Sequence, residues 1–391
     1  MLNSASEKLL SNLLAVGAAF TTIFVVSNSV TDPVNVPKLL SLGVTAFAAF
    51  GVAIPALSRN NFKSFKYVWI ASALFLAFGL LSVLLSDSPS SQGIYGSYGR
   101  NNGYLAYLFL VLLLFSAVNF ARIESFRKLI YAFFFAGLIN ILYCLWAISF
   151  GDFIGWNNPY GNILGTFGNP NFIGAFLGIF IATYFAYGIS KESSKRFKYS
   201  MIFVLPVTAF EIVDSHAIQG RVVGAVGLAI VGFLYIRSRF KAPILIMYSV
   251  ASSAVGLLAL LGALQIGPLT SLIYKTSVSL RGQYWLAGWN TGQSHPFTGV
   301  GMDAFGDWYR RARDIHALTL PGVNTVVNAA HNVPVDMFAF GGWPLFLSYL
   351  VIVGLGGVAL FKTIKRSKKY DPILVCLATM WAGYQLQSII S

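Results

Sequence analysis

The chain has 391 residues, of which 56% are hydrophobic and only 10% are charged. A soluble protein carries about a quarter charged residues, so this composition excludes a soluble enzyme, a disordered chain and a secreted disulfide scaffold. The formal net charge of +14 would suit a nucleic-acid partner only if the basic residues clustered on a soluble face. They lie between apolar runs instead, so we expect a polytopic membrane protein with no nucleic-acid partner.

Eleven apolar runs are candidates for membrane helices, each of which needs about 20 residues to cross a bilayer core. They lie near residues 9–27, 38–57, 67–86, 104–121, 128–150, 171–190, 199–214, 218–236, 243–266, 335–361 and 372–391. The first run is longer than a typical signal-peptide core, so we interpret it as a membrane helix. The sequence therefore predicts an all-α integral membrane protein, a polytopic bundle of about 11 or 12 transmembrane helices.

The basic residues are distributed unequally between the two sets of loops. Nineteen of the 27 Lys and Arg residues fall on one side of the predicted membrane, and the other side holds Lys38, Arg100, Arg221, Lys275, Arg281, Arg310, Arg311 and Arg313. Cytoplasmic loops carry the excess of Lys and Arg. We therefore expect a cytoplasmic N-terminus and read most of the net charge as a topology signal.

One outer connection, residues 267–334, is far longer than a helix connector and is rich in Trp, Tyr, Gly, Arg and His. Long structured loops are where function concentrates. We expect three parts: nine transmembrane helices in 1–266, an extracytoplasmic helical loop that caps the site in 267–334, and two more transmembrane helices in 335–391. The candidate active site is therefore extracytoplasmic.

Two short helices are expected within this loop. The first runs from about Ser279 to Trp289 and places Tyr284 and Trp285 on one side. Arg281 at its start is poorly placed for a cation by the helix dipole, which favours an anionic partner; a lipid phosphate or a structural ion pair is the alternative. The second helix, 303–313, ends in Arg310, Arg311 and Arg313, for which structural and ligand-binding roles are equally open.

His331 lies where the chain re-enters the membrane, next to Asn332. Histidine is the side chain best suited to take a proton near neutral pH, although a lone loop histidine commonly serves only as a hydrogen-bonding group. No second His or carboxylate stands at metal-ligand spacing, so we expect no metal site. The membrane interior is nearly free of ionisable groups, apart from Glu211, Asp214 and Arg221 toward one end, which argues against an ion-coupled transporter.

Taken together in this order, several segments resemble the superfamily of O-antigen ligases, Wzy-type polymerases and protein O-oligosaccharyltransferases. They are Gly99–Gly103, Gly165–Asn171, Asp214–Arg221, Arg281–Trp285, Pro296–Phe305, Ala330–Asn332 and Gly341–Gly342. Members commonly have a further helix after the eleventh, so we expect either a shortened chain or a short variant.

The resemblance implies a helical bundle of the bacterial inner membrane with an outward loop over a lateral cavity. It implies an inverting, metal-independent glycosyltransferase without a cofactor, whose donor is a glycan on undecaprenyl pyrophosphate and whose acceptor is a glycan, lipid or protein. His331 would act on the acceptor hydroxyl. Arg281 and Arg221 would contact the pyrophosphate, although Arg221 matches the family pattern imperfectly, and Arg100 and the Arg310–Arg313 cluster would help to hold anionic groups.

Independent reasoning from topology agrees with this expectation. No nucleotide sugar or ATP is available outside the cytoplasm, so a donor there must arrive activated and membrane-bound, and arginine forks can stabilise a pyrophosphate leaving group. Two other functions stay open. One is a lipid-linked oligosaccharide flippase or permease; the other is a cell-wall polymerase that relies on a carboxylate, Asp303 or Asp307.

Overall fold

The computed structural model describes residues 2–26, 32–56, 63–154, 158 and 161–390, and in these ranges it contains helices and no strands. The helices of its bundle are α1 (Ser4–Ile23), α2 (Asn35–Ala53), α4 (Lys66–Leu85), α6 (Tyr104–Ala117), α7 (Ile123–Phe150), α8 (Pro170–Gly188), α9 (Lys195–Asp214), α10 (Ile218–Arg239), α11 (Ala242–Ala263), α15 (Val333–Arg366) and α16 (Pro372–Ile390). Each corresponds to one of the eleven expected spans. The expected span ends at residues 27, 57 and 391 lie outside the described residues.

Eight of these helices are long and apolar enough to cross a membrane, counted over the described residues. The other three are α1 and α9, which carry more polar residues, and α6, which has 14 residues. This helical, strand-free architecture with multiple spans confirms the predicted class of polytopic membrane protein.

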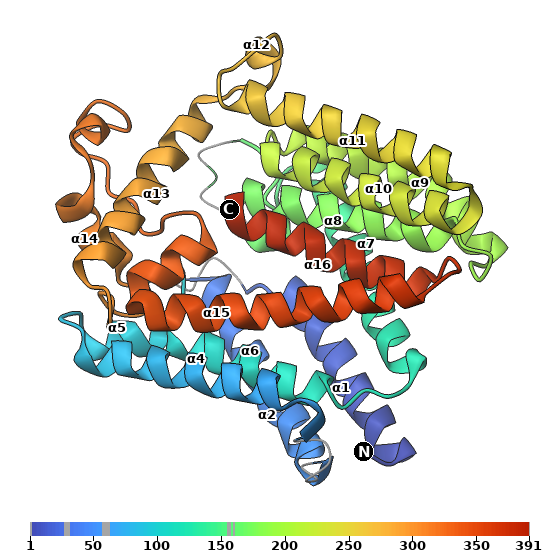
Figure 1. Ribbon diagram of the computed structural model, residues 1–391, viewed down its shortest axis with the longest axis horizontal. Helices are drawn as coiled ribbons and strands as arrows, with labels where there is room; N and C mark the ends of the chain where they lie inside the picture. Colours follow the sequence, from blue (N-terminus) through green and yellow to red (C-terminus); the bar gives the residue numbers. More distant parts are fainter. Residues whose placement is uncertain (1, 27–31, 57–62, 155–157, 159–160, 391) are drawn as a thin grey trace.

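The long connection after α11 forms α12 (Thr270–Ile273), α13 (Thr276–Ser294), α14 (Phe305–Ala312) and the 3-10 turn η3 (Ile315–Leu318). Figure 1 shows α13 and α14 at the end of the bundle where α15 begins and α16 ends. A short helix, α5 (Ser90–Tyr95), lies at the same end, and the 3-10 turns η1 (Ile54–Ala56) and η2 (Gly165–Phe167) complete the set.

The buried side chains divide the bundle into two main packing groups. One core joins α7, α8, α9, α10 and α16 around residues such as Phe134, Phe180 and Cys376. The other joins α4 and α15 to α13 and α14 of the long connection, here called the outer helices after the orientation predicted from the sequence, through Phe75, Ala287, Phe305, Tyr309 and Met337. The outer helices therefore share a hydrophobic core with the membrane helix that follows His331.

Glycines allow the backbones of α8 and α10 to approach each other closely. A Cβ on Gly178 would lie 2.5 Å from the carbonyl oxygen of Gly220, and a Cβ on Gly220 would lie 2.5 Å from the carbonyl oxygen of Gly174. Small residues that let backbones approach are the usual means of packing helices within a membrane. This agrees with the spacing of Gly174, Gly178, Gly220 and Gly224 in the sequence.

Helix α15 is broken at Gly341 and Gly342, where Gly342 has φ 64°. Pro344 cannot donate the hydrogen bond that the carbonyl of Phe340 would otherwise accept. The outer loop uses the break: Gly301 N–H donates to Phe340 O at 3.1 Å, Val300 N–H donates to Ala339 O at 2.9 Å, and Trp343 N–H donates to Pro296 O at 2.8 Å. The break thus fixes the segment between α13 and α14 onto α15.

Candidate active site

His331 sits in a tight turn just before α15. Its φ is 57°, a left-handed conformation that is uncommon for a residue other than glycine. Asn332 caps the helix by accepting the N–H of Val335 at 3.1 Å, and the Asp336 carboxylate accepts the N–H of Ala330 at 2.8 Å. The turn is therefore held from both sides of His331, and its side chain is half-buried.

Helix α13 carries Arg281 and, one turn further on, Tyr284. The ring centroid of Tyr284 lies 5.7 Å from that of His331 and 6.1 Å from that of Tyr309. Figure 1 shows α13 running beside the start of α15, and Gly288 makes this possible, because a Cβ there would lie 2.6 Å from a Val335 methyl group. The fold thus brings His331 and the Arg281–Trp285 segment into one region, as expected.

The predicted position of Arg281 at the start of a helix is wrong. Helix α13 begins at Thr276, five residues before Arg281, whereas the dipole effect falls off within the first turn. The Nε of Arg281 is buried and has no hydrogen-bond partner among the described residues, and this burial lowers the pKa of the guanidinium, although nearby Tyr284 opposes the shift. A desolvated cation with an unused donor is suited to an anionic ligand.

Other buried polar atoms in the same helices also lack partners within the described structure. They are Oε1 of Gln283, Nε1 of Trp285 and the hydroxyl of Tyr309. Buried polar groups are normally hydrogen-bonded, so these atoms are candidates for contact with a polar ligand, although Tyr309 itself is fully buried in this structure. Trp285 was an expected site residue. Gln283 and the Tyr309 hydroxyl were missed, since nothing in their spacing distinguishes them from packing residues.

Arg100 forms an ion pair with Asp303. Its Nε lies 3.1 Å from the Asp303 carboxylate, which also accepts the N–H groups of Ser97 and Asn102 at 2.8 and 3.3 Å. Asp303 is fully buried; burial raises its pKa, and Arg100 opposes that shift. In the structure Arg100 therefore ties the loop before α6 to the outer loop.

The three arginines at the end of α14 have protein partners as well. Arg313 donates to the carbonyl of Val323 at 3.1 Å, and Arg310 donates to that of Asn324 at 3.4 Å. Arg311 lies over the ring of Trp308, 4.8 Å from its centroid. These contacts hold the segment after η3 against α14, which is the structural role left open by the sequence.

Arg221 is exposed on α10 and donates to the carbonyl of Val213 on α9 at 3.3 Å. Its neighbour Gln219 is buried and donates to Ile390 O at 3.2 Å. Asn332, at the start of α15, donates to the adjacent carbonyl of Ile389 at 3.2 Å. The start of α10, the start of α15 and the end of α16 therefore meet. Since residues two apart point in nearly opposite directions on a helix, Arg221 faces away from this junction.

Comparison with known proteins adds one finding. The family described as O-antigen ligase matches residues 212–350, a stretch that contains Arg221, Arg281, the Arg310–Arg313 cluster and His331. No curated protein matches the chain. The match confirms, over residues 212–350, the resemblance to the O-antigen ligase superfamily that the sequence motifs indicated.

Proposed function

We propose that the chain is a membrane glycosyltransferase that moves a glycan from an undecaprenyl-pyrophosphate-linked donor to an acceptor hydroxyl on the outer side of the bacterial inner membrane. The observation that carries the proposal is that two groups inside the O-antigen ligase match lie on either side of Tyr284, Arg281 one turn before it on α13 and His331 against its ring. One is the Nε of Arg281, which is buried and has no partner among the described residues. The other is the half-buried ring of His331, which lies against the ring of Tyr284.

Arg281 is the pyrophosphate-binding group of this proposal. Its guanidinium offers several donors in a planar fork that matches phosphate oxygens. Negative charge grows on the pyrophosphate as it leaves, and a cation already removed from water stabilises that charge more strongly than a hydrated one. Arg221 was the second expected pyrophosphate ligand, but it donates to Val213 O and faces away from the junction of α10, α15 and α16, so we assign the pyrophosphate to Arg281. Arg100 and the Arg310–Arg313 cluster also have protein partners, and in this proposal they contribute positive charge toward anionic groups of the donor.

His331 is the general base. Its imidazole takes the proton of the acceptor hydroxyl while that oxygen attacks the anomeric carbon. The bond from this carbon to the pyrophosphate oxygen breaks, and the lipid pyrophosphate leaves with the electron pair, so that the configuration inverts. Tyr284, Trp285 and Asn332 position the groups around the ring, with Asn332 doing so by capping α15.

Complementation of a deletion strain tests this proposal. The wild-type chain restores the glycan profile, whereas His331→Asn lowers transfer by roughly a hundredfold or more, the usual cost of losing a general base. Arg281→Lys lowers it by about tenfold or more, because a point charge cannot replace a fork. Matched controls are His316→Asn and Arg239→Lys, at exposed positions outside the site.

The outcomes separate the competing functions. Wild-type transfer by His331→Asn excludes His331 as the base, and an unchanged rate for Arg281→Lys removes that residue from the site. In the deletion strain, loss of a polymer ladder indicates a polymerase, while lipid-linked polymer beside a bare acceptor indicates a ligase. A flippase would instead leave lipid-linked glycan on the cytoplasmic side.

A further inference from the structure

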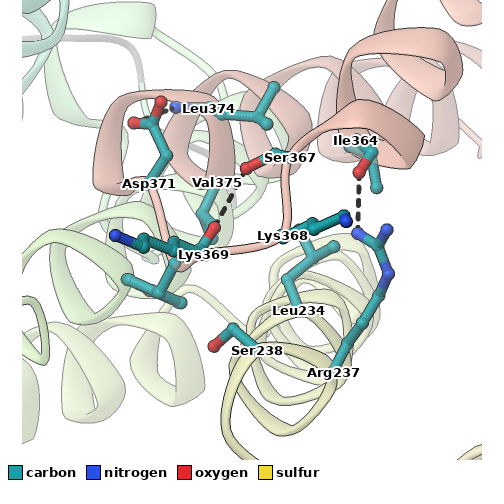
Figure 2. A pocket seen from close by; sticks show the side chains of 11 residues that line it. Leu234, Arg237, Ser238, Ile364, Ser367, Lys368, Lys369, Asp371, Leu374 and Val375 are labelled. Carbon is teal, nitrogen blue, oxygen red and sulfur yellow. Dashed lines mark hydrogen bonds between the residues drawn. The ribbon is translucent and has the colours of Figure 1, made fainter.

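A small cavity of about 200 Å³ opens at the end of α15 that lies farthest from His331. Figure 2 shows it between the last turn of α10, the last turn of α15 and the start of α16. It is lined by Leu234, Arg237, Ser238, Ile364, Ser367, Lys368, Lys369, Tyr370, Asp371, Leu374 and Val375. Because α15 has 34 residues and each helical residue rises about 1.5 Å, the cavity lies at the opposite membrane face from His331.

Three cations line this cavity: Arg237, Lys368 and Lys369. In the part of the chain that the structure describes, none of them forms an ion pair. Figure 2 shows Lys368 extending toward Arg237. Asp371 is the one acidic residue among the described residues of the lining, so three cations face one carboxylate and the cavity carries an excess of positive charge.

The other polar groups around the cavity already have partners, which leaves the two lysines and the unused donors of Arg237 as its binding groups. The Asp371 carboxylate accepts the N–H groups of Ile373 and Leu374 at 2.9 and 3.2 Å, so it caps α16. The hydroxyl of Ser367 donates to Lys369 O at 3.0 Å. Arg237 donates to Ile364 O at 2.7 Å and to Lys365 O at 3.4 Å, contacts that fix its guanidinium at the cavity and leave three of its five donors unused.

The remaining lining residues are apolar. Leu234, Ile364, Leu374 and Val375 belong to helices long and apolar enough to span a membrane, and the cations lie at the ends of these helices. A ligand that fits must pair an anionic head with an apolar body. Free phosphate satisfies only the first requirement, whereas an anionic phospholipid satisfies both, and basic pockets between transmembrane helices are suited to such headgroups.

We propose that this cavity binds the phosphate of an anionic phospholipid, with Arg237, Lys368 and Lys369 as its counter-charges and the apolar wall in contact with the glycerol and upper acyl chains. The site is separate from the proposed glycan transfer and lies across the membrane from it. Binding there ties together the ends of α10, α15 and α16, the helices whose opposite ends meet beside Asn332.

Thermal unfolding of the purified full-length chain in detergent tests this site. Phosphatidylglycerol in mixed micelles should raise the unfolding temperature in a saturable way, and neither phosphatidylcholine nor inorganic phosphate at the same concentration should do so. The test variant is Lys368→Gln with Lys369→Gln, because neither side chain pairs with a described residue and the fold should survive. Its half-saturating concentration of phosphatidylglycerol should rise by roughly tenfold or more.

The matched control is Lys191→Gln with Lys195→Gln, which removes the same charge from exposed residues that do not line the cavity and should keep wild-type binding. An equal loss in the control variant would overturn the proposal, since attraction would then come from general surface charge. An equal shift with inorganic phosphate would overturn the assignment to a lipid. Lys368→Arg with Lys369→Arg should retain binding, and loss of binding there contradicts a role for charge.

Discussion

The left-handed backbone of His331 is the most telling feature of the site at the scale of a single residue. This conformation costs most residues about 1 kcal/mol or more in free energy, whereas glycine adopts it without that cost. Strain of this kind concentrates at functional positions. His331→Gly should therefore be more stable than His331→Ala by about 1 kcal/mol, while both lack transfer. Thermal melting of the two purified variants measures the difference, and a less stable glycine variant contradicts strain at this position.

Asp336 acts on this turn through Ala330. The N–H of Ala330 is buried and donates to the Asp336 carboxylate, so Asp336→Ala should cost about 1–3 kcal/mol and lower transfer by loosening the turn. Asp336→Asn keeps an acceptor oxygen and should retain most of both. Melting temperature and transfer are measured for each variant. If Asp336→Asn is damaged as severely as Asp336→Ala, then the negative charge matters for catalysis and the hydrogen bond alone does not explain the residue.

The sequence predicts candidate site residues where a single side chain lies in a recognisable local motif. It does not predict contacts between residues that are distant in the chain. His331 and Arg281 were selected because of their positions at expected helix starts and within family motifs. The ion pair of Arg100 with Asp303 joins residues 203 apart in the chain, and no local pattern indicates it. For the same reason the backbone partners of Arg310 and Arg313 were not foreseen.

At the scale of elements, the apolar runs predicted each of the eleven helices of the bundle that the structure describes, but the helix ends depended on details that hydropathy does not contain. Helix α6 ends at Ala117, four residues before the expected boundary, because the Asn119 side chain donates to Phe115 O at 2.8 Å and competes with the helical pattern. Helix α13 begins three residues before the expected start. The short helix α5 has only six residues, too few to show a periodic pattern.

The break in α15 gives a prediction about how the outer loop is held. A Cβ on Gly342 would collide with the carbonyl of Pro296, and its positive φ adds strain. Gly342→Ala should therefore loosen the 296–301 segment, expose it to limited proteolysis and reduce transfer. Gly354→Ala is the matched control in the same helix, since a Cβ there meets nothing within 4 Å, and it should be neutral or slightly stabilising. Equal protease resistance of both variants would show that the break does not hold the loop.

At the scale of the whole molecule, charge and loop length indicated which ends of the helices face the same side, but not which ends touch. The contacts of Gln219 with Ile390 and of Asn332 with Ile389 bring together three helices whose ends are far apart in sequence. Such contacts depend on the packing of α8, α10 and α16 in one core. Hydropathy predicts the order of the membrane helices along the chain, but it does not predict how these helices pack around one another.

The unequal distribution of Lys and Arg predicts the orientation, and cysteine labelling can test it. Cys144 and Cys376 are both buried and can be replaced by alanine. Val323, which is 56% exposed on the outer loop, and Lys191, exposed in the loop before α9, then each receive a single cysteine. A membrane-impermeant maleimide should label Val323→Cys in right-side-out membranes and Lys191→Cys only after the membranes are disrupted. The reverse pattern would place His331 on the cytoplasmic side, where nucleotide sugars are available and the reason for a lipid-linked donor disappears.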